Sequence, residues 1–114
     1  MTEHFPPRTE IVRDEAGRRV ASADIAVVNE AARASLSVDA GHVPAGTREQ
    51  LVDAVLDSPE VSASHQIDVA IPIGDADMLH RIRERCDNTE SHTAGASCLI
   101  KAEVPNTSIA PDEG

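Results

Sequence analysis

The sequence is almost free of aromatic residues: Phe5 is the only one, and Trp and Tyr are absent. A hydrophobic core must therefore be built from β-branched aliphatic residues and alanine, which predicts a thin core. No apolar run approaches the roughly 20 residues that a bilayer span requires, and no charged-then-apolar signal segment opens the chain. With 114 residues, we expect a single domain in the cytoplasm, without membrane contact.

Cysteine and basic charge are also scarce. Cys86 and Cys98 are too few for a disulfide scaffold, and no C-x-x-C redox pair is present. Lys and Arg number 10 against 20 Asp and Glu, so the formal net charge is −10. Such a charge repels phosphate backbones and argues against nucleic acid as a partner, unless Arg81, Arg83 and Arg85 form a local basic patch.

Composition divides the chain into three parts. Residues 1–8 contain a Pro-Pro pair and no periodicity, which predicts a flexible arm. Residues 105–114 contain two prolines and end on Glu-Gly, which predicts a disordered tail. Residues 9–104 hold no linker and no internal repeat, so we expect one α+β domain there.

Alternation of apolar and polar residues predicts five strands, over residues 9–14, 19–28, 34–38, 67–73 and 98–104. Gly17 suits a hairpin turn between the first two strands because it takes a positive φ without steric cost. Residues 87–96 are polar and predict a loop.

Two segments carry helical signals. Thr47 and Gln50 have the spacing of a capping box, an apolar stripe follows to residue 56, and Pro59 ends the helix. Asp75 is placed to cap a second helix up to about residue 86. The predicted fold is α+β, a mixed sheet of about five strands with two helices in the order ββ-β-α-β-α-β, each helix linking strands that could be parallel.

Few reactive groups stand in a recognisable pattern. His80, Cys86, His92 and Cys98 recur at intervals of six, but residues six apart on a helix differ by about 240°. Structural zinc sites usually pair ligands two to four residues apart, so we expect no metal. A catalytic set drawn from Cys98, His92, Ser97 and Asp87 has no local signature such as G-x-S-x-G to support it.

The segment from residue 41 to residue 48 joins a predicted strand to a helix and contains two glycines and a proline. Backbone N–H groups of Gly46, Thr47 and Arg48 could bind an anion at the helix N-terminus, and Arg48 would add positive charge. Glu49 in the same turn opposes an anion. A plain strand–helix loop is the alternative interpretation.

This order of elements resembles the C-terminal part of the GCN5-related N-acetyltransferase (GNAT) family. The pieces that carry the resemblance are the strand over residues 18–28, the passage from Leu36 to Val43-Pro44, the helix from Arg48 to Leu56, and the strand over residues 67–73 with the following helix at residues 75–82.

The resemblance implies an acetyl-CoA pyrophosphate site at Val43, Gly46, Thr47 and Arg48, and a general acid or base near His80, where the family often has a tyrosine. The family's Q/R-x-x-G-x-G/A loop is reduced here, because Arg48 is followed by Glu49-Gln50-Leu51 without a glycine. The family's N-terminal strand and two helices have no room in the eight-residue arm. The resemblance therefore implies a truncated or degenerate member that has lost the cofactor.

Our leading hypothesis from the sequence is a small, acidic, non-enzymatic binding or regulatory domain of GNAT-like shape, without a cofactor, that acts through protein or small-molecule contacts. The alternative is an acyl-CoA-dependent N-acyltransferase with a reduced pyrophosphate loop. A homodimer is one hypothesis for the partner, beside another protein, because the two helices are expected to leave apolar strand residues unshielded, namely Ala21, Ala23, Ile25, Leu36 and Val38.

Overall fold

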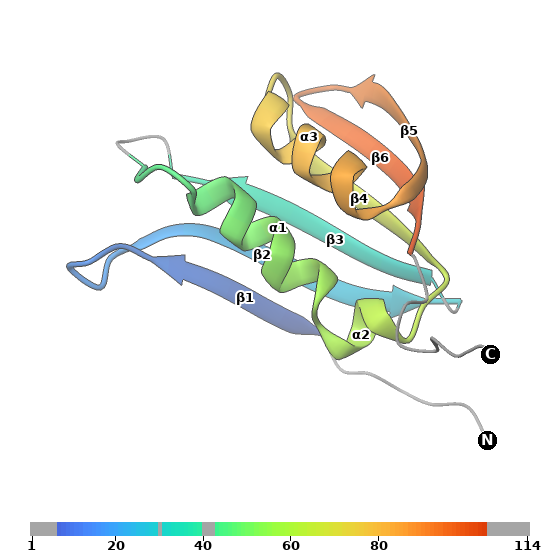
Figure 1. The fold of residues 1–114 in the computed structure, drawn as a ribbon, viewed down its shortest axis with the longest axis horizontal. Helices are drawn as coiled ribbons and strands as arrows, with labels where there is room; N and C mark the ends of the chain where they lie inside the picture. The colour runs from blue at the N-terminus through green and yellow to red at the C-terminus, as the bar shows by residue number, and fades with distance from the viewer. Residues whose placement is uncertain (1–6, 30, 40–42, 105–114) are drawn as a thin grey trace.

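The computed structural model describes residues 7–29, 31–39 and 43–104, which form one mixed six-stranded sheet with its helices on one face (Figure 1). The strands are β1 (Arg8–Arg13), β2 (Arg19–Val28), β3 (Ala31–Val38), β4 (Gln66–Pro72), β5 (Asp87–Ala94) and β6 (Ser97–Glu103). The helices are α1 (Thr47–Leu56), α2 (Pro59–Ser62) and α3 (Ala76–Arg85). In the described part of the chain, no helix is long and apolar enough to cross a membrane.

The first three strands form an antiparallel meander, β1-β2-β3. Gly17 has φ 84° in the turn between β1 and β2, as the sequence predicts. The Asp14 carboxylate fixes this turn by accepting from the N–H groups of Ala16 at 3.0 Å and Arg18 at 2.8 Å. The local sequence therefore defines both the turn and the pairing that follows it.

The second half of the sheet continues in the order β4-β6-β5. β3 and β4 are parallel and are linked through α1 and α2. β6 is antiparallel to both β4 and β5, so β5 runs in the same direction as β4. The predicted parallel link holds across α1. Across α3 it is wrong: the predicted strands at residues 67–73 and 98–104 correspond to β4 and β6, which are antiparallel, because the chain first forms β5 after α3 and then turns back.

The core lies between the sheet and the helices. Val20, Ile25, Ile67 and Ile71 are buried there beneath α1 and α3. Four of the residues expected to form an unshielded apolar surface, Ala21, Ala23, Ile25 and Leu36, belong to this same buried core. The stated reason for dimerisation is therefore wrong, because the helices cover those side chains.

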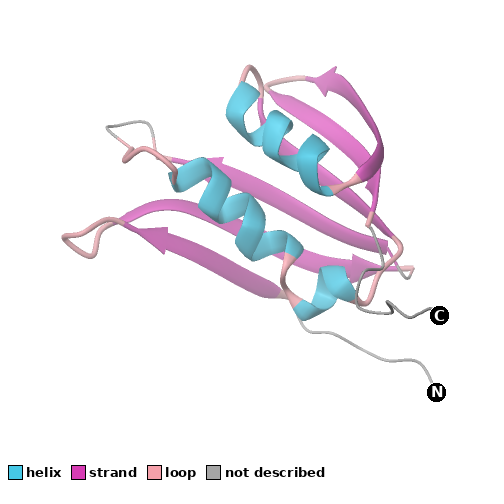
Figure 2. Ribbon diagram, viewed as in Figure 1, coloured by secondary structure: helices cyan, strands magenta, loops and turns pink. Residues whose placement is uncertain are grey.

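The α+β mixed sheet is confirmed, with two elements that the sequence analysis missed (Figure 2). Residues 87–94 form β5, so the predicted loop is wrong. The sequence analysis missed this edge strand because it is exposed on both faces and has no apolar alternation. Pro59 ends α1 but also begins α2, whose N-cap Ser58 accepts from the N–H of Val61.

The predicted chain ends fall largely outside the described residues, namely residues 1–6 of the arm and all of the tail, 105–114. Arg8, the last residue of the predicted arm, begins β1. Its Nε donates to the buried carboxylate of Glu60 in α2 at 3.0 Å. The ordered sheet thus starts one residue before the predicted boundary.

Candidate functional site

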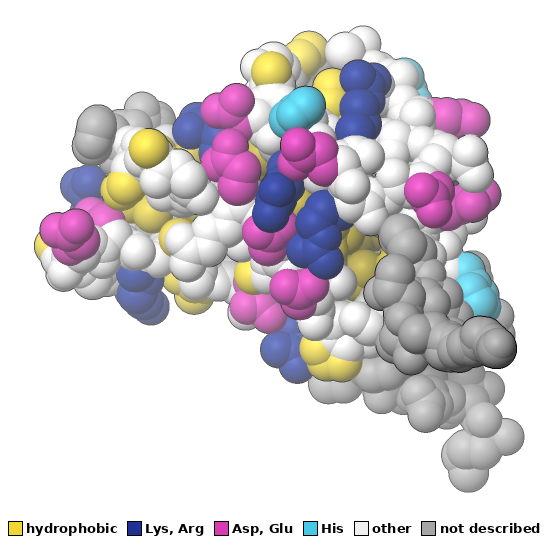
Figure 3. All heavy atoms as spheres, in the orientation of Figure 1, with side chains coloured by type: hydrophobic (Ala, Val, Ile, Leu, Met, Phe, Trp, Pro, Cys, Tyr) yellow, Lys and Arg dark blue, Asp and Glu magenta, His cyan; other side chains and the backbone are white. Residues whose placement is uncertain are grey.

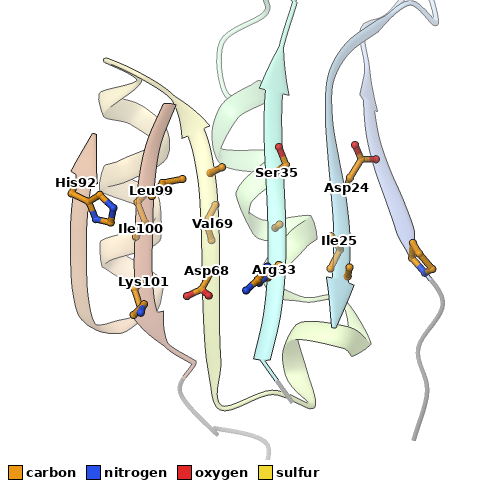
Figure 4. Close-up of a pocket in the computed structure, with 14 residues that line it drawn as sticks. Asp24, Ile25, Arg33, Ser35, Asp68, Val69, His92, Leu99, Ile100 and Lys101 are labelled. Carbon is orange, nitrogen blue, oxygen red and sulfur yellow. The ribbon is translucent and has the colours of Figure 1, made fainter. Parts of the chain in front are cut away.

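The parallel strands β3 and β4 separate toward their C-terminal ends. They pair from Ala32 and Ile67 to Ser35 and Ala70. β3 then continues to Val38 and β4 to Pro72 without pairing with each other. Figure 4 shows the two ribbons diverging. This opening leaves the facing backbone groups of the last residues of β3 without a partner on β4.

The N-terminus of α1 lies on the chain segment that follows β3. Its N-cap is Gly46, with φ 85°, and no side chain of the described residues caps it. The predicted capping box is therefore wrong: the N–H of Gln50 donates to the Gly46 carbonyl at 2.9 Å, which puts Thr47 inside the helix. Thr47 is buried and does not serve as the cap.

This geometry has an electrostatic consequence. Helix N-termini carry unsatisfied N–H groups and a partial positive charge, which a side-chain cap normally offsets. Gly46 offers no side chain for this purpose, and a Cβ built on it would meet nothing within 4 Å. The N–H of Thr47, one of the predicted donors, already donates to the Pro44 carbonyl at 3.2 Å. The N–H groups of Arg48 and Glu49 donate to no described residue and are open to an anionic group.

Arg48 connects the N-termini of α1 and α3. Its Nε donates to an Asp75 carboxylate oxygen at 2.9 Å, and the other Asp75 oxygen accepts from the N–H of Met78 at 3.1 Å, which caps α3 as predicted. The Arg48 side chain is 35% exposed and that of Asp75 is 7% exposed. Since a guanidinium has five N–H donors, Arg48 keeps donors beyond its Nε that no described residue uses.

A cavity of about 420 Å³ lies beside this ion pair. It is lined by Arg48 and by the segment that leaves β4, from Pro72 to Asp77. Gly46 and Thr47 adjoin Arg48 in sequence, and Val43 is half-buried just before them. The carboxylates of Asp75 and Asp77 offset part of the positive potential, so the anion site is weaker than the bare helix end suggests.

The structure places His80 away from this cavity. Its side chain lies on the exposed side of α3 and is 76% exposed. Its Nε2 is 3.2 Å from a Glu84 carboxylate oxygen, one helical turn further on. His80 does not line the cavity beside Arg48, and its role as a general acid or base stays a prediction.

The arginines of α3 do not form a basic patch. Arg81 donates to both carboxylate oxygens of Asp53, at 2.9 and 2.8 Å, and Arg85 donates to Asp53 at 3.0 Å and to Asp57 at 2.8 Å. These bonds lower the pKa of the Asp53 carboxyl below its usual value, and the hydrogen bonds from Arg81 have the largest effect. Blue and magenta side chains accordingly alternate over the two helices in Figure 3. This cluster ties α1 to α3 and pairs two of the three arginines of α3 with carboxylates.

The residues considered for metal binding do not gather either. Within the described ranges, no group of three or more His, Cys, Asp or Glu side chains could hold a metal ion. Burial raises the pKa of the Cys86 thiol, which disfavours the thiolate that a metal requires. His92 pairs with Leu99, whereas Cys98 pairs with Thr93, the next position along the strand, so their side chains point to opposite faces of the sheet.

A second cavity, of about 540 Å³, lies on the sheet face opposite the helices (Figure 4). Its lining includes Arg33 on β3, Asp68 on β4, and Leu99 and Lys101 on β6. The sequence analysis missed it. The period-two alternation that predicts these strands also places their polar residues together on one face of the sheet. This pattern could have indicated the polar residues that line the cavity.

The order, pairing and opening of the elements define a GNAT-like acetyltransferase fold, and comparison with solved structures supports this class. The chain superposes on a ribosomal-protein-alanine N-acetyltransferase from Brucella melitensis with a TM-score of 0.61 at 13% identity, covering 85% of this chain and 68% of that one. A chimeric spermidine N-acetyltransferase from Vibrio cholerae gives 0.62 at 16% identity, covering 90% and 71%. A Klebsiella pneumoniae protein described as an acyl-CoA N-acyltransferase gives 0.63 at 13% identity, covering 86% and 72%.

No protein-family model and no curated protein matches the chain. The structural comparison confirms the resemblance to the GNAT fold. It also corrects our leading functional hypothesis: these structural neighbours are named as acetyltransferases or acyltransferases, so a non-enzymatic binding domain is no longer the favoured interpretation. At 13–16% identity the likeness establishes the fold.

Proposed function

We propose that the chain is an acyl-CoA-dependent N-acyltransferase that moves an acyl group to a primary amine. The observation that carries the proposal is the opening between β3 and β4 beyond Ser35 and Ala70, on the same chain segment as the uncapped N-terminus of α1. The fold shared with named acetyltransferases supports the same assignment.

The residues present fit an acyl-CoA. The segment Val43–Arg48 leads into the first turn of α1, where the N–H groups of Arg48 and Glu49 donate to no described residue. With the guanidinium donors of Arg48 other than Nε, these groups suit a pyrophosphate. The unpaired strand edges beyond Ser35 and Ala70 offer backbone donors and acceptors to an extended amide-containing chain. Bound acyl-CoA would supply the activated thioester, and the protein would orient it against the amine.

Asp75 has two roles in this proposal. It caps α3, and it holds Arg48 at the edge of the cavity by the 2.9 Å bond to Nε. The carboxylate fixes the guanidinium but also reduces its attraction for an anion. We therefore expect binding weaker than that of a glycine-rich phosphate loop.

A cytoplasmic location suits this activity. Both cysteines are free, Cys86 buried and Cys98 half-buried, which is usual in a reducing compartment.

The test of the proposal is thermal unfolding with and without acetyl-CoA. A ligand that binds the folded state at ten times its Kd stabilises it by about 1.4 kcal/mol. In a domain of this size that raises the Tm by several degrees. We expect this rise for the native chain at about millimolar acetyl-CoA, accompanied by release of free CoA thiol when an amine such as spermidine is added.

The matched variants are Arg48→Ala and Arg83→Ala. Both remove one arginine from a helix, but Arg83 is exposed and lies at the far end of α3 from the cavity. Arg48→Ala should lose most of the shift and Arg83→Ala should keep it. Absence of any shift in the native chain, or equal loss in both variants, would contradict the proposal.

A further inference from the structure

The face of the sheet opposite the helices carries a regular row of charges. The cross-strand partners Arg33 on β3, Asp68 on β4, Lys101 on β6 and Glu90 on β5 follow one another across four adjacent strands. Their signs alternate, positive, negative, positive, negative. Figure 4 shows Arg33, Asp68 and Lys101 side by side on this face.

These four charges are not used within the described part of the chain. None of them makes an ion pair there, although nine such pairs are present elsewhere. Arg33, Lys101 and Glu90 are exposed and Asp68 is half-buried. Asp68 accepts one long hydrogen bond, 3.4 Å, from the Gln66 amide. The row is therefore available to an external partner.

We propose that this open face binds a second copy of the same chain, about a two-fold axis that runs roughly along the strands between β4 and β6. Such an axis places β4 opposite β6 of the partner and β3 opposite β5 of the partner. Each positive member of the row then meets a negative one: Asp68 meets a lysine and Arg33 meets a glutamate. An alternating row is self-complementary about this axis, as a two-fold interface requires.

The neighbouring row supports the same axis. Two residues further along the strands, on the same face, Ser35, Ala70, Leu99 and His92 are cross-strand partners in that order. The two central members are the apolar ones, so the axis brings Ala70 and Leu99 of each copy together. The axis therefore brings an apolar pair together beside the opposite charges of Asp68 and Lys101.

Sheets that pack face to face lie about 10 Å apart and are rotated by about 30°. This rotation moves the outer strands out of alignment, while the strands beside the axis stay aligned. The central pair, Asp68 with Lys101, should therefore contribute more than Arg33 with Glu90. A contacting surface with charges of one sign only is a poorer fit, because it would meet two like charges in the row.

The dimer does not depend on the acyltransferase assignment. Both rows lie at or before Ser35 and Ala70, where β3 and β4 are still paired, whereas the opening between these strands begins beyond them. The partner would therefore cover the paired region and its 540 Å³ cavity and leave the cavity beside Arg48 accessible.

Charge exchange at the central pair tests the proposal by light scattering at tens of micromolar. The native chain should have twice the monomer mass of 12.1 kDa. Asp68→Lys and Lys101→Asp should each be monomeric, because each opposes like charges across the axis. Glu15→Lys, the same change of charge in the exposed turn before β2, should remain dimeric.

Mixing the two variants separates an interface from a folding defect. A chain with Lys at both central positions faces one with Asp at both, so an equimolar mixture should recover the dimeric mass, as should the double exchange in one chain. A monomeric native chain, or a dimer that survives Asp68→Lys, would overturn the proposal, as would a mixture that stays monomeric while both variants show native circular dichroism.

Discussion

The two ten-residue helices, α1 and α3, pack on the same face of the sheet but are held there by different means. α1 buries five of its residues, including Leu51, Val52 and Val55, whereas α3 buries only Met78 and Ile82. α3 instead has a side-chain cap, Asp75, and ion pairs through Arg81 and Arg85.

This difference bears on the candidate site. A helix that gains its stability from apolar packing does not need a satisfied N-terminus, because capping contributes only about 1 kcal/mol. α1 can therefore leave its first N–H groups open to a ligand at little cost. α3 has less apolar contact, and its cap and surface bonds are a larger share of what holds it.

The largest expected effect concerns the buried apolar side chains of the two helices. Leu51→Ala in α1 removes a fully buried side chain and should cost about 2–5 kcal/mol of unfolding free energy. Leu79→Ala in α3 removes a partly buried one and should cost about 1 kcal/mol. Urea denaturation of both variants measures the difference, and equal losses would show that α3 is held by packing after all.

The cap of α3 gives the next largest effect. Asp75→Ala should lose about 1–2 kcal/mol, because the N–H of Met78 and the guanidinium of Arg48 both lose their acceptor. Asp75→Asn keeps the cap and should lose only part of this. If the proposed function is right, the asparagine variant should also bind acetyl-CoA more tightly than the native chain, as measured by calorimetry, since Arg48 no longer faces a carboxylate.

The link between the two helices through Asp53 should respond to pH. Arg81 and Arg85 lower the pKa of Asp53 below 3.8, so the folded state binds its proton less readily than the unfolded chain does. The stabilisation is present above the unfolded pKa and is lost as the pH falls through the lower, folded value. Asp53→Asn should therefore lower the unfolding free energy by about 1 kcal/mol at pH 7, a modest value because solvent screens these partly exposed ion pairs. The loss should become smaller as the pH is lowered.

Urea denaturation of the native chain and Asp53→Asn between pH 7 and acid pH measures this dependence. Asp39→Asn, at an exposed position after β3, is the control. The difference in unfolding free energy between this variant and the native chain should not shrink as the pH falls. A constant difference between the native chain and Asp53→Asn at all pH values would show that the bonds to Arg81 and Arg85 are not the cause.

Apolar alternation predicted the sheet well where one face of a strand is buried. It identified β2 and β4 correctly because half of their residues pack under helices, and it failed at β5, where both faces are exposed and only backbone pairing with β6 defines the strand. The Gly46–Arg48 segment was recognised as a helix N-terminus, but its cap was assigned to Thr47. The bond from Arg48 to Asp75 spans 27 positions, and no local pattern reveals a contact over that separation.

The smallest expected effect concerns His80 on the exposed side of α3. Its contact with Glu84 is a surface pair one turn apart, which contributes a few tenths of a kcal/mol at most. His80→Gln should therefore change the unfolding free energy by less than about 0.5 kcal/mol and leave both the acetyl-CoA thermal shift and the rate of CoA release unaltered. A fall in that rate with an unchanged thermal shift would instead show that the imidazole takes part in proton transfer, and that α3 moves toward the cavity when substrate binds.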